Sequence, residues 1–316
     1  MNALEWNKLV QKNAPPFGAF LQSWEWGELQ KKMGFSVRRV YCKEDHGELI
    51  AQCILQPLPF KRSYWFVPKG PLGTMSPQDV LSRLKSELND GDFIKIEPDR
   101  PLPGGIQAAE RHPAATSLLT LGASYGDLRN GMKEKTRYNI GVGLRKGVTV
   151  ALQSPISDLP IFLDLMAETA KRDGFHPHTE DHYRALLEVL NTPNCQAFLA
   201  IAYLEGTPLA ANIMIDAFGA RTYVHGASSS TNRNAMAPYV LHAELIKDAC
   251  EKGFAYYDFW GIAPPAASPE HAWQGITRFK KGFGGHDVVM SGTFDIPRRR
   301  LGYGLYSLAK RLQSLV

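Results

Sequence analysis

The chain has 316 residues, of which 44% are hydrophobic and 21% are charged, and its formal net charge is +5. This composition is typical of one large or two medium globular domains and excludes an intrinsically disordered chain. The mild positive charge suits a partner that carries phosphate groups, such as a tRNA or a membrane face, and suits a generic basic protein equally well.

The cysteines and the N-terminus indicate the compartment. Cys42, Cys53, Cys195 and Cys250 form no paired motif and lie in apolar sequence, so we expect buried free thiols, as in a reducing cytosol. The first residues lack the apolar core of a secretion signal, and no apolar run is long enough to span a bilayer. The sequence therefore predicts a cytoplasmic protein.

The first part of the chain predicts alternating helices and strands. Ser23 and Ser76 are expected N-caps, Pro77 fits a first helical turn, and Gly34 fits a helix end. The expected elements, in chain order, are a helix over 23–34, a strand hairpin over 35–60, a strand over 63–73, a helix from Ser76 and a strand over 92–98.

The second part predicts a similar order. The expected elements are a helix over 156–175, a helix that Thr179 caps, three antiparallel strands over 195–228, a helix over 238–253 and a strand over 254–261. The fold class is therefore α/β (α+β), with two packed units. A strand meander followed by a helix and a further strand is the layout of a GNAT acyltransferase core, which makes acyl transfer a hypothesis.

A GNAT acetyltransferase holds coenzyme A on backbone N–H groups at the start of the helix after the meander. That contact needs glycine, because a Cβ blocks close approach to phosphate. The corresponding segment here, 228–240, contains no glycine, and Pro238 removes one donor. Coenzyme A is therefore disfavoured as the acyl donor.

Two short motifs near the C-terminus draw attention. In FAYYDFWG, strand alternation places Tyr256, Asp258 and Trp260 on one face, and a structural role for Asp258 is slightly favoured over catalysis. In AWQGITRFKKG, helical spacing places Lys280 on the apolar side and Lys281 in solvent. Periodicity alone favours a snorkelling Lys280 over a lysine that serves a cleft.

Three histidines suggest a metal site, but their spacing argues against one. His178 and His182 are four residues apart, whereas Pro177 and the cap at Thr179 leave His176 on a different element. No cysteine or acidic residue completes a known ligand spacing, so we expect no metal.

Six blocks of the sequence resemble the FemABX family, the aminoacyl-tRNA-dependent peptidyltransferases of peptidoglycan synthesis. The blocks, in chain order, are FLQSWEWGELQKKMGF (20–35), YWFVPKGPLG (64–73), FIKIEP (93–98), MKEKTRYNIGVGLRKGVTV (132–150), AKRDGF (170–175) and YYDFWGI with RFKKGFGG (256–262 and 278–285). The resemblance implies two tandem GNAT-like domains with mixed, mostly antiparallel sheets flanked by helices. Their expected bounds are 1–147, completed by 296–316, and 148–295. No long heptad run is present, so the chain resembles the compact FemX-like form.

The resemblance implies transfer of an amino acid from aminoacyl-tRNA to the side-chain amine of the stem peptide of a peptidoglycan precursor. The acceptor is UDP-MurNAc-pentapeptide or lipid II, aminoacyl-tRNA is a co-substrate, no further cofactor is expected, and the protein is expected to be a monomer. The alternatives are a coenzyme-A-dependent N-acyltransferase that acts on another amine, and a non-catalytic binding module.

The resemblance also implies roles for residues of the second domain. Lys280 matches the family lysine that stabilises the oxyanion formed when the amine attacks the ester. Tyr223 and His225 are expected to line the cleft, and Tyr256 and Asp258 to order its wall.

Several expected substrate contacts depart from the family pattern. The family lysine that contacts the UDP-linked substrate falls at Gln30, and Lys31 is expected to replace it. The substrate-binding Arg and Tyr of the second domain align with His178 and His182, which suggests a different acceptor. Glu97 stands in the place of the strand-end acid of the first domain and is not expected to be a general base.

Two basic segments are candidate phosphate contacts. The first contains Lys133, Lys135, Arg137, Arg145 and Lys146, for which a solvated helix face is an equally good interpretation. The second, over 297–312, predicts a basic amphipathic helix. Packing of this helix on the first domain is favoured over peripheral contact with the inner face of a membrane.

Overall fold

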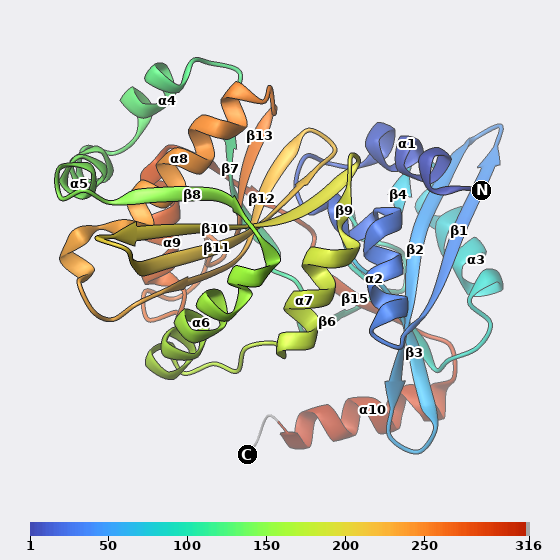
Figure 1. The fold of residues 1–316 in the computed structure, drawn as a ribbon. Helices are drawn as coiled ribbons and strands as arrows, with labels where there is room; N and C mark the ends of the chain where they lie inside the picture. Colours follow the sequence, from blue (N-terminus) through green and yellow to red (C-terminus); the bar gives the residue numbers. More distant parts are fainter. Residues whose placement is uncertain (314–316) are drawn as a thin grey trace. The chain divides into compact units, whose positions relative to one another are not determined.

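The computed structural model describes residues 1–313, which divide into two compact units (Figure 1). Unit 1 comprises residues 1–15, residues 21–114 and the segment that begins at Val289. Unit 2 comprises residues 16–20 and 115–288. Within the described residues, no helix is both long and apolar enough to cross a membrane.

Unit 1 is built on a mixed sheet with strand order β1-β2-β3-β5-β15-β6, and β4 pairs with β2. Strands β1 to β3 form an antiparallel meander, β5 runs parallel to β3, and β15 runs antiparallel to β5. The elements are α1 (Ala3–Asn13), α2 (Trp24–Lys32), β1 (Ser36–Glu44), β2 (Gly47–Leu58), β3 (Arg62–Val67), β4 (Leu72–Gly73), α3 (Pro77–Glu87), β5 (Phe93–Ile96), β6 (Ile106–Ala108), β15 (Thr293–Pro297) and α10 (Arg300–Gln313). A short 3₁₀ helix, η1 (Ala19–Gln22), has residues in both units.

The predicted helix starts of unit 1 are confirmed. The Ser23 side chain accepts a hydrogen bond from the backbone N–H of Trp26, and Ser76 accepts one from Asp79. Each bond satisfies a backbone donor that the first helical turn leaves without a partner. Buried apolar residues of the meander, α3 and β5 then form the core of the unit.

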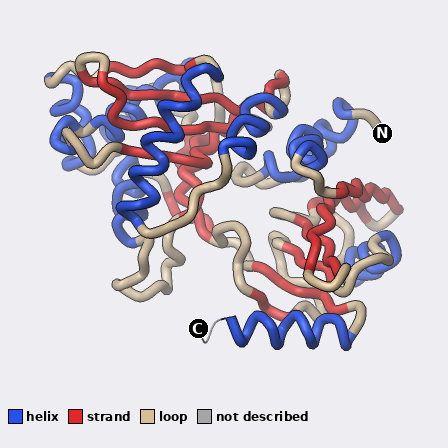
Figure 2. The backbone as a smooth tube through the Cα atoms, turned by 60° about the horizontal axis from the view of Figure 1, so that its bottom comes forward, coloured by secondary structure: helices blue, strands red, loops and turns tan. Residues whose placement is uncertain are grey.

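Unit 2 is built on a sheet with strand order β14-β7-β13-β12-β11-β10-β8, and β9 pairs with β10. Helices α6 and α8 cover opposite faces of this sheet (Figures 1 and 2). The elements are β7 (Ala115–Thr120), α4 (Tyr125–Gly131), α5 (Glu134–Arg145), β8 (Thr149–Ser154), η2 (Ile156–Asp158), α6 (Leu159–Asp173), α7 (Glu180–Val189), β9 (Asn191–Thr192), β10 (Cys195–Leu204), β11 (Thr207–Ala217), β12 (Ala220–Ser228), η3 (Arg233–Ala235), α8 (Ala237–Glu251), β13 (Tyr256–Gly261), α9 (Gln274–Lys280), η4 (Lys281–Phe283) and β14 (His286–Val289).

The predicted fold class is confirmed, and both units share one chain order. In unit 2 the antiparallel meander β10-β11-β12 is followed by α8 and by β13, which pairs parallel to β12. In unit 1 the meander β1-β2-β3 is followed by α3 and by β5, which pairs parallel to β3. This order is the one that the GNAT-like prediction requires.

The domain bounds differ from those expected. Residues 115–147, which were expected in the first domain, lie in unit 2, because β7 pairs antiparallel with β13. Gly143 of α5 also lies against α8, where a Cβ would stand 2.4 Å from a Val240 methyl group. Conversely, the chain returns to unit 1 at Val289, because β15 pairs with both β5 and β6.

Candidate active site

Strands β12 and β13 of unit 2 separate partway along their length. Their parallel pairing runs from Ala220 with Tyr256 to Thr222 with Asp258, whereas β12 continues to Ser228 and β13 to Gly261. The pairing of β13 with β7 also shifts register between Asp258 and Gly261. The last residues of β13 are therefore not paired with β12.

Lys280 ends α9 and reaches the place where these strands separate. Its side chain is buried, and its Nζ donates a hydrogen bond of 2.7 Å to the Gly261 carbonyl on β13. The same Nζ lies 5.2 Å from the centre of the Tyr223 ring on β12, which is a cation–π contact. As predicted, Lys280 is the more buried of the two lysines, but Lys281 is half-buried rather than in solvent and pairs with Asp287 at 2.8 Å.

Gly282, two residues after Lys280, holds the end of α9 in place. A Cβ on Gly282 would lie 2.4 Å from the Thr136 hydroxyl of α5, so only glycine allows this approach. The Gly282 carbonyl accepts a hydrogen bond from the backbone N–H of Lys133 at 2.9 Å. On the other side of α9, the Thr277 hydroxyl accepts one from the backbone N–H of Ala263, so the helix is tied to the chain after β13.

The charge of Lys280 is weakly compensated. Burial lowers the pKa of its ammonium group to about 7, and the negative charge of Asp258 opposes that shift. Within the described residues, Lys280 makes no ion pair at direct contact distance. A buried lysine near its own pKa at neutral pH is a frequent feature of functional sites.

Asp258 and Tyr256 lie on β13, the strand whose Gly261 carbonyl accepts the hydrogen bond from Lys280. Asp258 is buried, and its Oδ1 accepts hydrogen bonds from the Thr116 hydroxyl and, at 2.8 Å, from the backbone N–H of Trp260. These bonds order the end of the strand, as the structural interpretation of Asp258 requires. Tyr256 starts β13, five residues before Gly261.

A buried polar network that the sequence analysis missed lies under Tyr223. The His242 ring of α8 meets the Tyr223 ring edge-on, with 4.6 Å between ring centres. Its Nδ1 lies 2.7 Å from the Tyr257 hydroxyl, and its Nε2 lies 3.4 Å from the Asn212 amide nitrogen. Burial, and then the charge of Lys280, lower the pKa of His242 to about 3, so the ring is neutral at physiological pH. The sequence feature that could have revealed this network is His242 itself, a histidine among the apolar residues of α8.

Tyr223 and His225 lie on opposite faces of the sheet. Tyr223 is opposite Met214 on β11 and His225 is opposite Ile213, with a register shift between the two pairs. Opposed residues of an antiparallel pair share a face, and neighbouring residues of one strand do not. The irregularity therefore separates two side chains that simple alternation places together. Tyr223 faces α8, and His225 joins His178 and His182 near α7.

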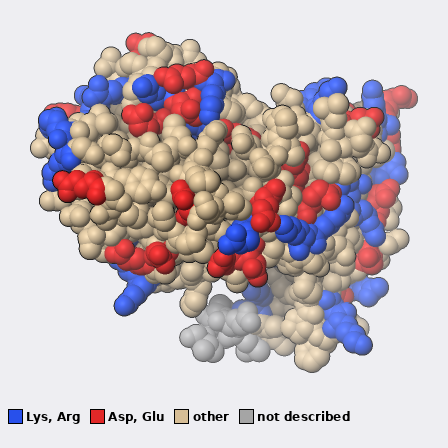
Figure 3. All heavy atoms as spheres, in the orientation of Figure 1, with Lys and Arg blue, Asp and Glu red and all other residues tan. Residues whose placement is uncertain are grey.

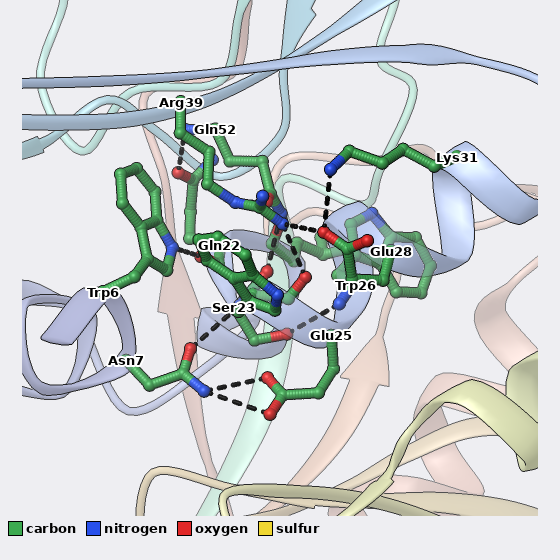
Figure 4. Close-up of polar contacts among 12 residues, drawn as sticks. Trp6, Asn7, Gln22, Ser23, Glu25, Trp26, Glu28, Lys31, Arg39 and Gln52 are labelled. Carbon is green, nitrogen blue, oxygen red and sulfur yellow. Dashed lines mark hydrogen bonds and ion pairs between the residues drawn. The ribbon is translucent and has the colours of Figure 1, made fainter. Parts of the chain in front are cut away.

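Two predicted substrate contacts lie in unit 1. The buried Glu97 carboxylate accepts hydrogen bonds from the backbone N–H groups of Lys69 and His112 and lies 2.8 Å from Nδ1 of His112. Burial raises the pKa of Glu97, but the charge and hydrogen bonds of His112 outweigh burial and lower that pKa to about 2. Lys31 reaches Glu28 at 3.0 Å, and Arg39 reaches the same carboxylate (Figure 4).

Arg137 connects two helices. It lies in the first turn of α5 and donates hydrogen bonds to the carbonyls of Asn130, at 3.0 Å, and Met132. These carbonyls lie at the end of α4, so the contacts fix the turn between α4 and α5. Among the described residues, no hydrogen bond or ion pair joins Arg137 to Lys280.

Comparisons with known proteins agree with this architecture. The FemAB family model matches residues 2–96, 112–207 and 202–311. A lipid II:glycine glycyltransferase of Staphylococcus aureus (strain MRSA252) is 22% identical, over 98% of this chain and 94% of that protein. One from Staphylococcus epidermidis is also 22% identical, over 94% of this chain and 92% of that protein.

Solved structures give the same result for the fold. The crystal structure of FemX matches with a TM-score of 0.81 and 19% identity, over 96% of this chain and 98% of that one. The structure of L-PGS from Bacillus licheniformis matches less well, with a TM-score of 0.54, 12% identity and coverage of 95% and 97%. The family model covers most of the chain, and the chain therefore belongs to the FemAB family.

Proposed function

We propose that this protein is an aminoacyltransferase that moves an amino acid from aminoacyl-tRNA to the side-chain amine of a peptidoglycan precursor, which builds an interpeptide bridge. The observation that carries the proposal is the buried ammonium of Lys280, where β12 and β13 separate. The relatives named lipid II:glycine glycyltransferase support glycine as the first amino acid to test and lipid II as the first acceptor. UDP-MurNAc-pentapeptide is the soluble alternative acceptor.

The reaction replaces an ester with an amide. The acceptor amine attacks the carbonyl carbon of the aminoacyl ester, and the carbonyl oxygen gains negative charge. When that intermediate collapses, the bond to the tRNA ribose oxygen breaks, the ribose hydroxyl recovers a proton, and the amine loses one to substrate or water. Of the three N–H donors of Lys280, one binds Gly261, so the others remain for the developing oxyanion.

No carboxylate is assigned as a general base. Both carboxylates are buried: Oδ1 of Asp258 accepts two hydrogen bonds, and Glu97 accepts hydrogen bonds from two backbone N–H groups of its own unit. The start of α8 also gives little support to coenzyme A, because Pro238 in its first turn has no backbone N–H to donate to a phosphate. Aminoacyl-tRNA is therefore the proposed acyl donor, without a further cofactor.

The test is a transfer assay with defined donors and acceptors. Purified protein is incubated with charged tRNAs and either labelled lipid II or labelled UDP-MurNAc-pentapeptide, and products are identified by mass. The proposal predicts one added residue mass on the stem-peptide amine of at least one acceptor. Absence of transfer to both acceptors with every aminoacyl-tRNA, or tight acetyl-coenzyme A binding by calorimetry, would contradict it.

The C-terminal helix bears on the choice between the two acceptors. Tyr303 and Tyr306 of α10 pack against Phe93 of the sheet, with ring centres 5.4 and 4.6 Å apart. At 100° per residue, the leucines lie on the opposite side of the helix. The exposed fractions are 88% for Leu301, 60% for Leu305 and 55% for Leu308.

Basic side chains lie beside the first of these leucines. An open hollow there is lined in part by Lys61, Arg62, Arg299, Arg300 and Leu301. Exposed leucines on one helix face next to cations match an anionic lipid surface. Elsewhere, on the face in Figure 3, Lys and Arg side chains are interspersed with Asp and Glu. We therefore favour the lipid-linked acceptor, with the enzyme acting as a monomer on the cytoplasmic face of the membrane.

Sedimentation with lipid vesicles tests this contact. The protein should bind vesicles that contain phosphatidylglycerol, bind less at high salt, and leave phosphatidylcholine vesicles unbound. Leu305→Glu should abolish binding, whereas Leu144→Glu, at an exposed leucine of α5, should not. Equal binding by the two variants, or none by the wild-type protein, would leave the soluble acceptor as the better choice.

A further inference from the structure

Three histidines converge on one face of unit 2. His178 precedes α7, His182 lies in its first turn, and His225 lies on β12. One nitrogen atom from each ring lies within 4.8 Å of those from the other two. The sequence analysis considered His176 as the third histidine and expected no metal, whereas the structure brings His225, 43 positions beyond His182 along the chain, to His178 and His182.

The three rings are held in place from below. Tyr183 is buried, and its ring meets the His225 ring edge-on, with 5.1 Å between centres. Its hydroxyl accepts a hydrogen bond of 3.3 Å from the backbone N–H of His178. The Thr179 hydroxyl accepts one from the backbone N–H of His182. The backbones of His178 and His182 are therefore each held by a neighbouring side chain, and the rings remain free for a ligand.

The ring nitrogens are available and uncharged. Among the described residues, no hydrogen bond involves a ring nitrogen of His178, His182 or His225. An imidazole with the ordinary pKa near 6.5 is mainly neutral at pH 7. A neutral imidazole is the form that binds a metal ion.

We infer that His178, His182 and His225 form a binding site for a divalent transition-metal ion of the Zn²⁺ class. With Zn–N bonds near 2.0–2.1 Å, tetrahedral ligand atoms are about 3.3 Å apart, so a small inward rotation of the rings completes the set. His178 is exposed, which leaves a fourth position open to water or to an anionic oxygen of a substrate. The site does not depend on the proposed function, because Lys280 contacts Tyr223, which points to the other face of the sheet.

Metal titration of the full chain, free of any affinity tag and stripped with EDTA, tests the inference. Calorimetry should show one Zn²⁺ bound per chain, and Co²⁺ should give the visible absorption of a tetrahedral site. His225→Ala and His178→Ala should each weaken Zn²⁺ affinity about 100-fold or more. His176→Ala is the matched control and should bind as the wild-type protein does.

Thermal melts separate ligand loss from misfolding. Zn²⁺ should raise the melting temperature of the wild-type and His176→Ala proteins but not that of His178→Ala. Because His178 is exposed, its replacement by alanine should not unfold the protein. The inference is overturned if the wild-type protein binds no Zn²⁺, or if His178→Ala and His225→Ala bind it as tightly as His176→Ala does.

Discussion

Lys95 in unit 1 and Lys280 in unit 2 are both buried, with exposed fractions of 3% and 6%, but they meet different partners. Lys95 on β5 lies 2.5 Å from the Asp295 carboxylate on β15, and Asp295 also accepts a hydrogen bond from Tyr303. Among the described residues, Lys280 donates to a backbone carbonyl and lies at contact distance from no carboxylate. The charge of Lys95 is thus neutralised inside its own unit, and that of Lys280 is not.

The two units have the same order of helices and strands, so the difference distinguishes a buried lysine that stabilises the fold from one that can take part in chemistry. In a buried ion pair the two opposite charges neutralise each other, so the pair presents little net positive charge to a substrate. A buried cation held by one carbonyl retains donors and responds to any negative charge that develops beside it. Glu97 resembles Lys95 in this respect, because its carboxylate accepts hydrogen bonds from Lys69 and His112 within unit 1.

The largest expected effect concerns the paired lysine. Lys95→Met leaves the Asp295 carboxylate buried without its cation, and the free energy of unfolding should fall by about 3–5 kcal/mol. Urea unfolding measures the change. The double variant Lys95→Met/Asp295→Leu should recover most of the loss, and a single variant as stable as the wild-type protein would show that the pair is not buried as described.

For Lys280→Met, the change in the free energy of unfolding should depend on pH. The pKa of Lys280 falls from 10.5 in the unfolded chain to about 7 in the folded one, so between these pH values the unfolded state binds the additional proton. Wild-type stability should therefore rise relative to the variant across this range, by about 1.4 kcal/mol per pH unit at most. Urea unfolding of both proteins at several pH values gives the difference. A difference that does not change with pH would contradict the lowered pKa.

The pH dependence of transfer should show the same group. If the ammonium form is required, the wild-type rate, relative to that of Lys280→Arg, should fall by up to about tenfold per pH unit above pH 7. Arginine stays charged throughout, so the variant provides a reference without this titration. Single-turnover rates with the same substrates measure the ratio. A ratio that stays constant between pH 6 and pH 9 would exclude titration of Lys280 from the rate.

The smallest effect is expected at Glu97. His112→Ala removes one of its partners, and the stability should fall by about 1 kcal/mol at neutral pH, because the two backbone donors remain. The pKa of Glu97 is lowered from 4.5 to about 2, so its contribution is present above 4.5 and is lost as the pH falls toward 2. The wild-type and variant stabilities should therefore converge in acid, and transfer activity should be unchanged.

Local patterns predicted much of the fold. Caps at Ser23, Ser76 and Thr179 and the three-strand meander of unit 2 follow from residue type and short spacing, and all are confirmed. Helix α1 was missed, although Asn2 and Glu5 form a capping box at its start.

Long-range pairing and one irregular strand explain the differences. The bounds of the units depend on β7 with β13 and on β15 with β5, and both pairings join strands far apart in the chain. The separation of Tyr223 from His225 depends on a register shift that the alternating pattern does not reveal. The convergence of His225 with His178 and His182 depends on the same shift.

The most direct test of the central claim compares Lys280→Met with Lys95→Met in single-turnover transfer from glycyl-tRNA to lipid II. The account predicts that Lys280→Met loses about 100- to 1,000-fold in rate while it stays folded. Lys95→Met, assayed at a temperature where it remains folded, should transfer at close to the wild-type rate. Transfer by Lys280→Met at the wild-type rate would show that the buried ammonium only anchors α9 to Gly261 and that the chemistry lies elsewhere.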